Sequence, residues 1–381
     1  MAIRVEVKPE LLRWARDRAR LGLDDLAHRF PKLPEWEAGA ATPTFKQLEQ
    51  FAHATHAPFG YFFLADPPAE PMPIPDFRTV GGRQVGRPSP DLLDTIYLCQ
   101  QRQEWYRDYA QLQGQEPLAF VGSATLASDI ESTAATMRHA IGLDIDERRQ
   151  IPTWTEALRL FIGQADALGV LVMVNGVVGN NNHRRLDPKE FRGFALADPL
   201  APLVFVNGAD AKAAQMFTLA HELAHIWLGQ SALSDVEPVS APVQGVEAWC
   251  NRIAAELLVP LALIRQEYRR GEDLRGALDR LARQFKVSTL VVLKRIYDSG
   301  GITWDQLREA YDEELERLQA VPPGGGGDFY LTQAARVGKR FARALVTSTL
   351  EGQTLYRDAF RLLGFSKVAT FHELGHSLGI V

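Results

Sequence analysis

Residues 217–225 read FTLAHELAH, a pattern that predicts one particular helix at the centre of the fold. The helical pattern begins well before this stretch, where Asp210 can cap it, and Gly229 can end it. His221 and His225 are four residues apart, so a helix presents both imidazoles on one face, about a turn apart. Two such imidazoles can bind a single metal ion, and neutral imidazole nitrogen suits zinc.

The same stretch offers a base, and the next helical run offers a third ligand. Glu222 is turned about 100° around the helix from His221, from where it can take a proton from a water molecule at the metal. A catalytic zinc needs a third protein ligand, and Glu247, at the start of the following helical run, is the best candidate. Asn251 lies one turn further on the same face and can hydrogen-bond the free nitrogen of a ligand histidine. The sequence therefore predicts one Zn²⁺ per chain, bound by His221, His225 and Glu247; the alternative is two histidines on a helix that happens to carry a glutamate.

These residues resemble the ImmA/IrrE family of metallopeptidases, in its form with an amino-terminal Xre-type helix-turn-helix domain. The segments that carry the resemblance are PDFR (75–78), FRGFAL (191–196), PLVFVN (202–207), FTLAHELAH (217–225), residues 247–260 and YRDAFRLL (356–363). The resemblance implies a compact thermolysin-like zincin core, with the family's ligands falling on His221, His225 and Glu247 and its catalytic glutamate on Glu222. Described members of the family cleave repressor proteins, which implies that the substrate is another protein.

Two functions of different classes follow from these motifs. The first is a zinc-dependent endopeptidase that cleaves a specific regulator, such as a transcriptional repressor, and so relieves repression under stress. The alternative is a non-proteolytic DNA-binding regulator or antitoxin in which zinc is structural. Glu222 favours the peptidase, because a structural zinc site needs no base.

Composition limits the setting in which this chemistry can occur. The chain of 381 residues has 46% hydrophobic and 23% charged residues and a formal net charge of −5, which argues against a protein that is basic overall. Cys99 and Cys250 are far apart, which excludes a disulfide framework and suits a reducing cytosol. The amino terminus lacks the apolar core of a signal peptide, and no run of about 18 apolar residues predicts a membrane span. We therefore expect a soluble, cytoplasmic protein.

The length of the chain and its proline- and glycine-rich breaks predict several domains in a mainly helical α+β protein. Short runs rich in β-branched residues, closed by Asn-Gly, predict strands at 170–174 and 203–206. A proline-rich stretch and a run of four glycines at 324–327 predict two breaks. The expected domains are a helix-turn-helix domain (1–64), a linker (65–80), the zinc peptidase (81–310) and a helical carboxy-terminal region (311–381).

The amino-terminal domain departs from the Xre pattern at its recognition segment. Residues 31–35 (PKLPE) are short and hold two prolines, which suit only a first helical turn. Residues 1–64 carry nine basic and eight acidic side chains, a weak electrostatic footprint for DNA. The domain is expected either to bind DNA or to dock a protein partner, and the aromatic run Phe59, Tyr61, Phe62 and Phe63 is expected to be core.

Further features offer weaker predictions. The strand at 203–206 precedes the catalytic helix, where an edge strand can pair with an extended substrate; the alternative is an ordinary sheet edge. His183, in a polar loop, can flank the substrate cleft, and Tyr268 can donate a hydrogen bond to an oxyanion, whereas Glu256, on the opposite helix face from Glu247, is expected to be structural.

A second HExxH, formed by His372, Glu373 and His376, lies near the carboxy terminus. Only five residues follow it, and none is a metal-binding type, so a third ligand would have to come from upstream. Gly375 also weakens the helix by about 1 kcal/mol relative to alanine. We interpret the motif as a coincidence of sequence, and metal binding there is left open.

Overall fold

The computed structural model describes residues 3–77, 79–80, 83–84, 87–234, 245–319 and 329–380. The chain divides into two compact units: unit 1 comprises Met1–Pro73 and Val85–Ile96, and unit 2 comprises Ile74–Gln84 and Tyr97–Val381. The predicted glycine-rich break at 324–327, and Arg78 of the PDFR segment, lie outside the described residues.

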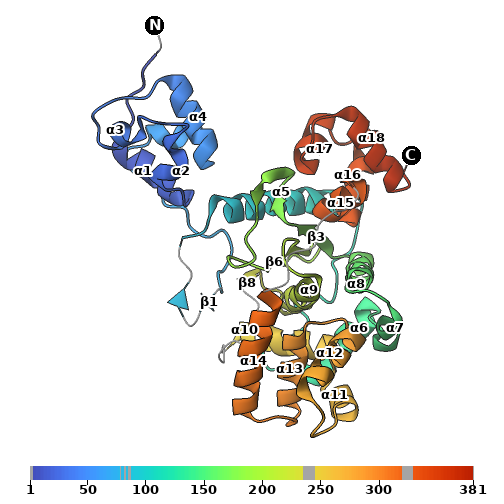
Figure 1. The fold of residues 1–381 in the computed structure, drawn as a ribbon. Helices are drawn as coiled ribbons and strands as arrows, with labels where there is room; N and C mark the ends of the chain where they lie inside the picture. Colours follow the sequence, from blue (N-terminus) through green and yellow to red (C-terminus); the bar gives the residue numbers. More distant parts are fainter. Residues whose placement is uncertain are drawn as a thin grey trace. The chain divides into compact units, whose positions relative to one another are not determined.

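Unit 1 is helical (Figure 1). Its core consists mainly of aromatic and leucine side chains. Its elements are α1 (Pro9–Arg18), α2 (Leu23–Ala27), α3 (Leu33–Glu37), α4 (Phe45–Thr55) and the 3₁₀ helix η1 (Phe59–Phe63). Thr44 and Gln47 form a capping box that starts α4. The expectation that the whole aromatic run is core is wrong in part, because Phe62 is buried while Phe63 is 54% exposed.

Unit 2 is built on a small mixed sheet, which confirms the mainly helical α+β class. Its four strands, in the order β3-β7-β6-β8, are β3 (Leu171–Asn175), β7 (Leu203–Asn207), β6 (Gly193–Leu196) and β8 (Ala232–Ser234). β3 runs parallel to β7, whereas β6 is antiparallel to both β7 and β8. Two further antiparallel pairs are β1 (Thr79–Val80) with β2 (Arg83–Gln84), and β4 (Val177–Val178) with β5 (Asn181–Arg185).

The sheet order corrects two predictions. The strand expected at 203–206 is not an edge strand, because β7 has hydrogen-bonded neighbours on both sides. Its main-chain groups are already paired, so β7 cannot receive an extended substrate. The polar stretch around His183 is not a loop, because it forms β5.

Helices cover the sheet on both sides and extend beyond it (Figure 1). They are α5 (Pro90–Leu112, which begins in unit 1), α6 (Ile130–Ile141), α7 (Ile145–Gln150), α8 (Trp154–Leu168), α9 (Lys212–Leu228), α10 (Val246–Leu258), α11 (Leu261–Glu267), α12 (Leu274–Phe285), α13 (Thr289–Asp298), α14 (Trp304–Gln319), α15 (Phe329–Val337), α16 (Lys339–Leu350), α17 (Tyr356–Leu363) and α18 (Val368–Ser377).

The central helix α9 is buried all along residues 215–227, because it packs against β6, β7, α8 and α10. It ends as predicted at Gly229, whose φ of 67° is the left-handed conformation that glycine adopts easily. The predicted cap is wrong by one residue: Ala211 is the N-cap, and Asp210 accepts a hydrogen bond from the Ala211 N–H instead.

The carboxy-terminal helices pack on β3, the strand at the far edge of the sheet. α15 contacts β3 directly, and a Cβ on Gly338 would lie 2.9 Å from the Val172 carbonyl oxygen, so the two backbones approach closely. The buried Arg102 guanidinium donates to the Leu362 carbonyl at 3.0 Å. These contacts make α15–α18 part of unit 2.

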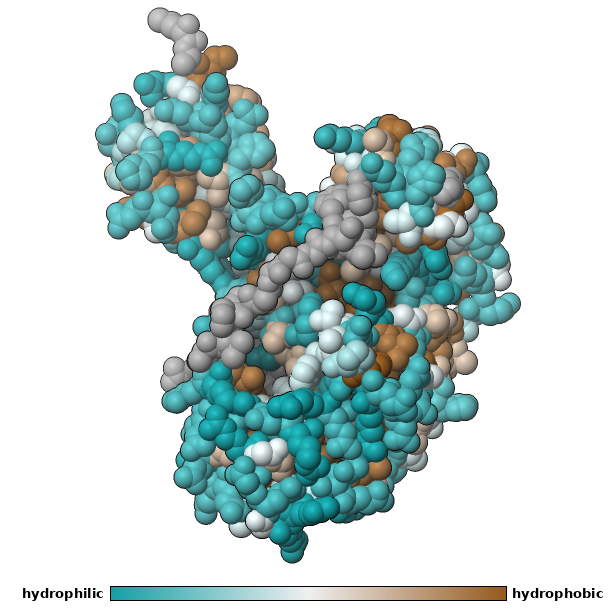
Figure 2. Space-filling model, turned by 45° about the vertical axis from the view of Figure 1, so that its right-hand side comes forward, coloured by the Kyte–Doolittle hydropathy of each residue, from teal (hydrophilic) through white to brown (hydrophobic). Residues whose placement is uncertain are grey.

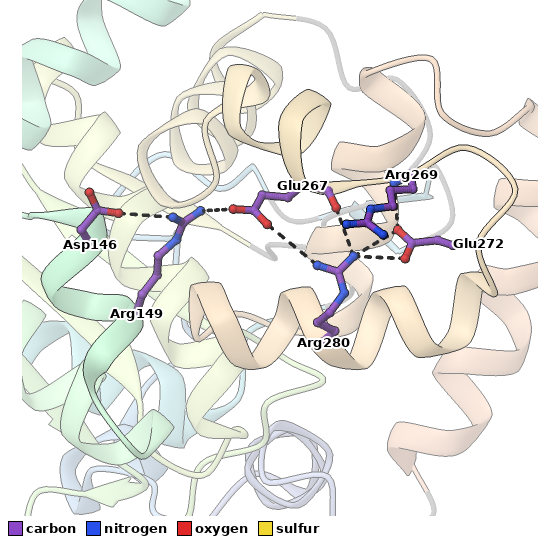
Figure 3. A network of polar contacts seen from close by, with 6 residues as sticks. All are labelled: Asp146, Arg149, Glu267, Arg269, Glu272 and Arg280. Atoms are coloured by element: carbon purple, nitrogen blue, oxygen red, sulfur yellow. Dashed lines mark hydrogen bonds and ion pairs between the residues drawn. The ribbon is translucent and has the colours of Figure 1, made fainter.

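Charged side chains join α7, α11 and α12 on the surface of unit 2 (Figure 3). Glu267 lies 3.1 Å from Arg149 and 3.9 Å from Arg280, which also contacts Glu272 at 3.1 Å. Most of this part of the surface is hydrophilic on the face drawn in Figure 2. No helix in the described ranges is both long and apolar enough to cross a bilayer.

Candidate metal and active site

Three side chains from two helices converge at one point in unit 2. His221 and His225 come from α9, and their Nε2 atoms are 3.1 Å apart. Glu247 comes from the first turn of α10, and its carboxyl oxygens lie 3.2 Å from His221 Nε2 and 3.1 Å from His225 Nε2. All three residues are buried. Within the described ranges, they form the only group of three or more His, Cys, Asp or Glu side chains with this geometry.

The triangle fits a small divalent cation. Tetrahedral zinc, with bonds of about 2.0–2.2 Å, separates neighbouring ligand atoms by about 3.3 Å, close to the distances seen here. One Glu247 oxygen, Oε1, is buried and lies 3.1 Å from His225 Nε2. Two imidazole nitrogens and a carboxylate are the donor set of a three-ligand catalytic zinc site. These residues can therefore hold a metal ion.

Asn251 fixes the ring of the first histidine. Its Oδ1 is 3.0 Å from His221 Nδ1, on the side of the ring away from the converging atoms. This contact favours a proton on Nδ1 and leaves Nε2 free to bind a cation. The structure therefore brings Asn251 to the position that the sequence predicted for it.

Glu222 lies beside the triangle in a fully buried position. Burial raises the pKa of its carboxyl well above the ordinary value, and the nearby Glu247 carboxylate raises it further. Neither Glu222 oxygen makes a well-formed hydrogen bond with the described residues. A raised pKa makes the ionised Glu222 carboxylate a stronger base than an ordinary carboxylate.

The pKa values of Glu247 and His225 are lowered, in contrast to that of Glu222. Burial acts to raise the pKa of Glu247, but the charges and hydrogen bonds of the two histidines outweigh it and lower that pKa to about 2. Burial lowers the pKa of His225, which favours the neutral imidazole that binds metals. The contacts with the two histidines therefore favour the carboxylate form of Glu247.

Gly193 of β6 leaves the space that Glu222 occupies. A Cβ there would lie 2.5 Å from Thr218 Cγ2, 2.8 Å from the Phe205 carbonyl oxygen and 3.1 Å from Glu222 Oε1. Any side chain at this position would push on α9 or on the Glu222 carboxyl. The glycine in the FRGF segment is therefore required by the approach of β6 to the helix.

Other predicted residues lie outside this cluster. His183 is exposed on β5. The Tyr268 ring lies against Gly301, where an added Cβ would be 2.7 Å from the Tyr268 Cε1 atom. Their catalytic roles stay predictions. Glu256 is buried and paired with Arg295, which fits the structural role expected for it. The second HExxH is on α18, where His372, Glu373 and His376 are all exposed.

Two residues near the cluster were not predicted. Ser234, at the end of β8, is buried with its Oγ 3.3 Å from His225 Nε2. The Phe77 ring lies nearly parallel to the His225 ring, with centroids 6.5 Å apart and an angle of 9° between the planes. Neither belongs to the HExxH helix or to the glutamate helix, so spacing within a motif could not reveal them.

Comparisons with known proteins place this cluster within a family match. No curated protein sequence matches the chain. Residues 337–377 match a domain of unknown function (DUF8813). Residues 165–297, which hold the sheet from β3 to β8 and the helices α9 and α10, match the peptidase family model described as IrrE N-terminal-like domain. This match supports a metallopeptidase-like function and the likeness of residues 165–297 to the ImmA/IrrE peptidases.

Proposed function

We propose that the chain is a zinc-dependent endopeptidase of the HExxH type that cleaves a specific protein regulator in the cytoplasm. The observation that carries the proposal is the convergence of three side chains beside the buried Glu222: the two histidine Nε2 atoms are 3.1 Å apart, and each lies within 3.2 Å of one of the two Glu247 carboxyl oxygens. His221, His225 and Glu247 are the proposed ligands. A transcriptional repressor is the proposed substrate, because described members of the family that the sequence resembles cleave repressors.

The chemistry follows from the positions of the side chains. Zinc, when bound, would supply a Lewis acid that polarises a water molecule and the scissile carbonyl. Glu222 takes a proton from the attacking water, whose oxygen bonds to the carbonyl carbon. The amide C–N bond then breaks, and Glu222 delivers the proton to the leaving nitrogen. Burial and the Glu247 carboxylate raise the pKa of Glu222, which strengthens it as the base in the first step.

The test separates metal binding from catalysis. Glu222→Gln should keep one zinc per chain, measured by elemental analysis, and should slow cleavage of a repressor substrate by about 10²–10⁴-fold. The matched control is Glu131→Gln, the same change at an exposed position on α6, which should leave the rate unchanged. Cleavage by Glu222→Gln at the rate of the parent protein would refute this mechanism.

DNA binding by unit 1 is a separate proposal with weaker support. The predicted recognition segment, residues 31–35, runs into the five-residue helix α3, which begins at Leu33 and carries Pro34 in its first turn. If the chain were instead a non-proteolytic regulator or antitoxin with structural zinc, operator binding would survive Glu222→Gln and no cleavage would occur. Gel-shift titration at several salt concentrations, run beside the cleavage assay, distinguishes the two functions.

A further inference from the structure

The segment Pro75–Phe77 pairs with the outer edge of the sheet. The Leu233 N–H donates to the Pro75 carbonyl at 2.9 Å, and the Phe77 N–H donates to the Leu233 carbonyl at 3.0 Å. These bonds align Asp76 with Leu233 in a parallel bridge. Leu233 is in β8, the strand at one end of the sheet order, and all of these residues belong to unit 2.

This edge of the sheet borders the candidate active site. Ser234, the residue after Leu233, has its hydroxyl 3.3 Å from His225 Nε2. On the other side of the pairing, the Phe77 ring is stacked on the His225 imidazole. The segment is therefore fixed both to the backbone of the edge strand and to the ring of a proposed metal ligand.

An extended polypeptide binds a sheet by pairing with the free main-chain groups of an edge strand. The sheet of unit 2 has two edges, and the β3 edge strand is packed against α15. β8 is the edge strand beside His225, and the Leu233 N–H and carbonyl that an extended substrate would use are bonded to Pro75 and Phe77. The chain's own segment and a substrate would thus need the same two groups.

We propose that Pro75–Phe77 is an internal ligand that competes with extended polypeptides for the β8 edge and holds the peptidase in an inhibited state. The inference rests on the proposed function, since it assigns substrate binding to the β8 edge at Leu233, beside the same site. A tethered segment has a high effective concentration, so it competes well even when each contact is weak. The apparent affinity for substrate then equals the intrinsic affinity multiplied by the fraction of molecules in which the β8 edge is free.

The sequence of the segment suits reversible pairing. Pro73 and Pro75 have no N–H, so they cannot donate to a ladder that extends towards the amino terminus. Among the described residues, the main-chain pairing consists of the two bonds at Leu233. Such a short contact can open locally while the rest of the sheet stays folded.

The first test removes one of the two hydrogen bonds. Phe77→Pro deletes the donor to Leu233, and Phe77→Ala keeps the donor but removes the stacked ring. The matched control is Ala69→Pro, which places a new proline at an exposed position of the same proline-rich stretch. In full-length zinc-loaded protein, hydrogen exchange of the Leu233 amide should rise at least about tenfold in Phe77→Pro and stay unchanged in the control.

The second test measures peptide binding to the β8 edge in the absence of catalysis. In a Glu222→Gln background, a fluorescent peptide with the sequence of residues 70–79 should bind Phe77→Pro at least about tenfold more tightly than it binds the parent chain. Phe77→Ala should give an intermediate affinity. Equal affinity for all variants, or Leu233 exchange that is the same in parent and Phe77→Pro, would overturn the proposal.

The third test asks whether freeing the β8 edge increases peptidase activity. With Glu222 intact and zinc bound, Phe77→Pro should cleave denatured casein about tenfold faster than the parent chain. If no variant cleaves casein or the repressor while the exchange and peptide results hold, the proposed function fails and the internal ligand stands. Cleavage of the chain itself between residues 75 and 78, detected by mass spectrometry, would show a substrate rather than an inhibitor and would overturn the inference.

Discussion

Gly193 is a single residue on which the geometry of the base depends. Gly193→Ala should lower the free energy of unfolding by about 1–3 kcal/mol, because the new methyl group meets Thr218 and the Phe205 carbonyl at distances that require movement. It should also reduce the cleavage rate more than it reduces zinc affinity, since Glu222 is displaced and the ligands are not. The measurements are thermal unfolding, zinc titration and the cleavage assay.

Gly163 provides the control for this change. It lies within α8, and nothing lies within 4 Å of a Cβ built there. Gly163→Ala should raise stability by about 0.5–1 kcal/mol, because alanine costs less conformational entropy in a helix. A Gly193→Ala protein as stable and active as the parent chain would mean that β6 can move away from α9.

Asn251 tests whether one hydrogen bond sets the metal affinity. Asn251→Ala should weaken zinc binding by about 10–100-fold, because His221 loses the partner that holds its ring and its tautomer. Arg252→Ala, an exposed neighbour on the same helix, should leave affinity unchanged. Competition against a fluorescent zinc chelator gives both values. If the two variants bind zinc equally well, Asn251 has no role in ligand orientation.

At the scale of elements, a buried ion pair connects α10 to α13. Glu256 and Arg295 are each almost fully buried, and Arg295 also donates to the Val259 carbonyl at 2.9 Å. Arg295→Met should cost about 3–5 kcal/mol, because it leaves a buried carboxylate without its partner. The double variant Arg295→Met/Glu256→Leu should recover most of that loss. The shift in the midpoint of chemical denaturation checks both; equal losses in the single and double variants would contradict the argument.

Local sequence patterns predicted the individual helices and strands better than they predicted which of these elements lie side by side. The spacing of His221 and His225, and the glycine at 229, are local features of one helix, so the sequence predicted α9 and the shared face of its two histidines. The order of strands depends on pairing between distant segments, and the run at 203–206 carries no sign that two strands flank it. Ser234 and Phe77 reach His225 through that same pairing, so their proximity could not be predicted.

For the whole molecule, metal content distinguishes the two HExxH motifs. The parent chain should hold one zinc after dialysis, His225→Ala should hold none, and His376→Ala should still hold one. Zinc at about 1,000 times its dissociation constant should add about 4 kcal/mol of stability to unit 2, seen as a higher melting temperature that a chelator reverses. Two ions per chain, with one lost in His376→Ala, would show that the exposed motif on α18 also binds metal.

The packing of α15 against β3 has a consequence for shortened versions of this gene product. A chain terminated in the glycine run at 324–327 would keep the whole segment that matches the peptidase family but would lose α15–α18. Most side chains of Leu171–Asn175 are buried, and without the carboxy-terminal helices the unpaired main-chain groups along that strand would be free to join a second molecule. Such a nonsense allele should therefore yield dimers or insoluble material, not a minimal peptidase.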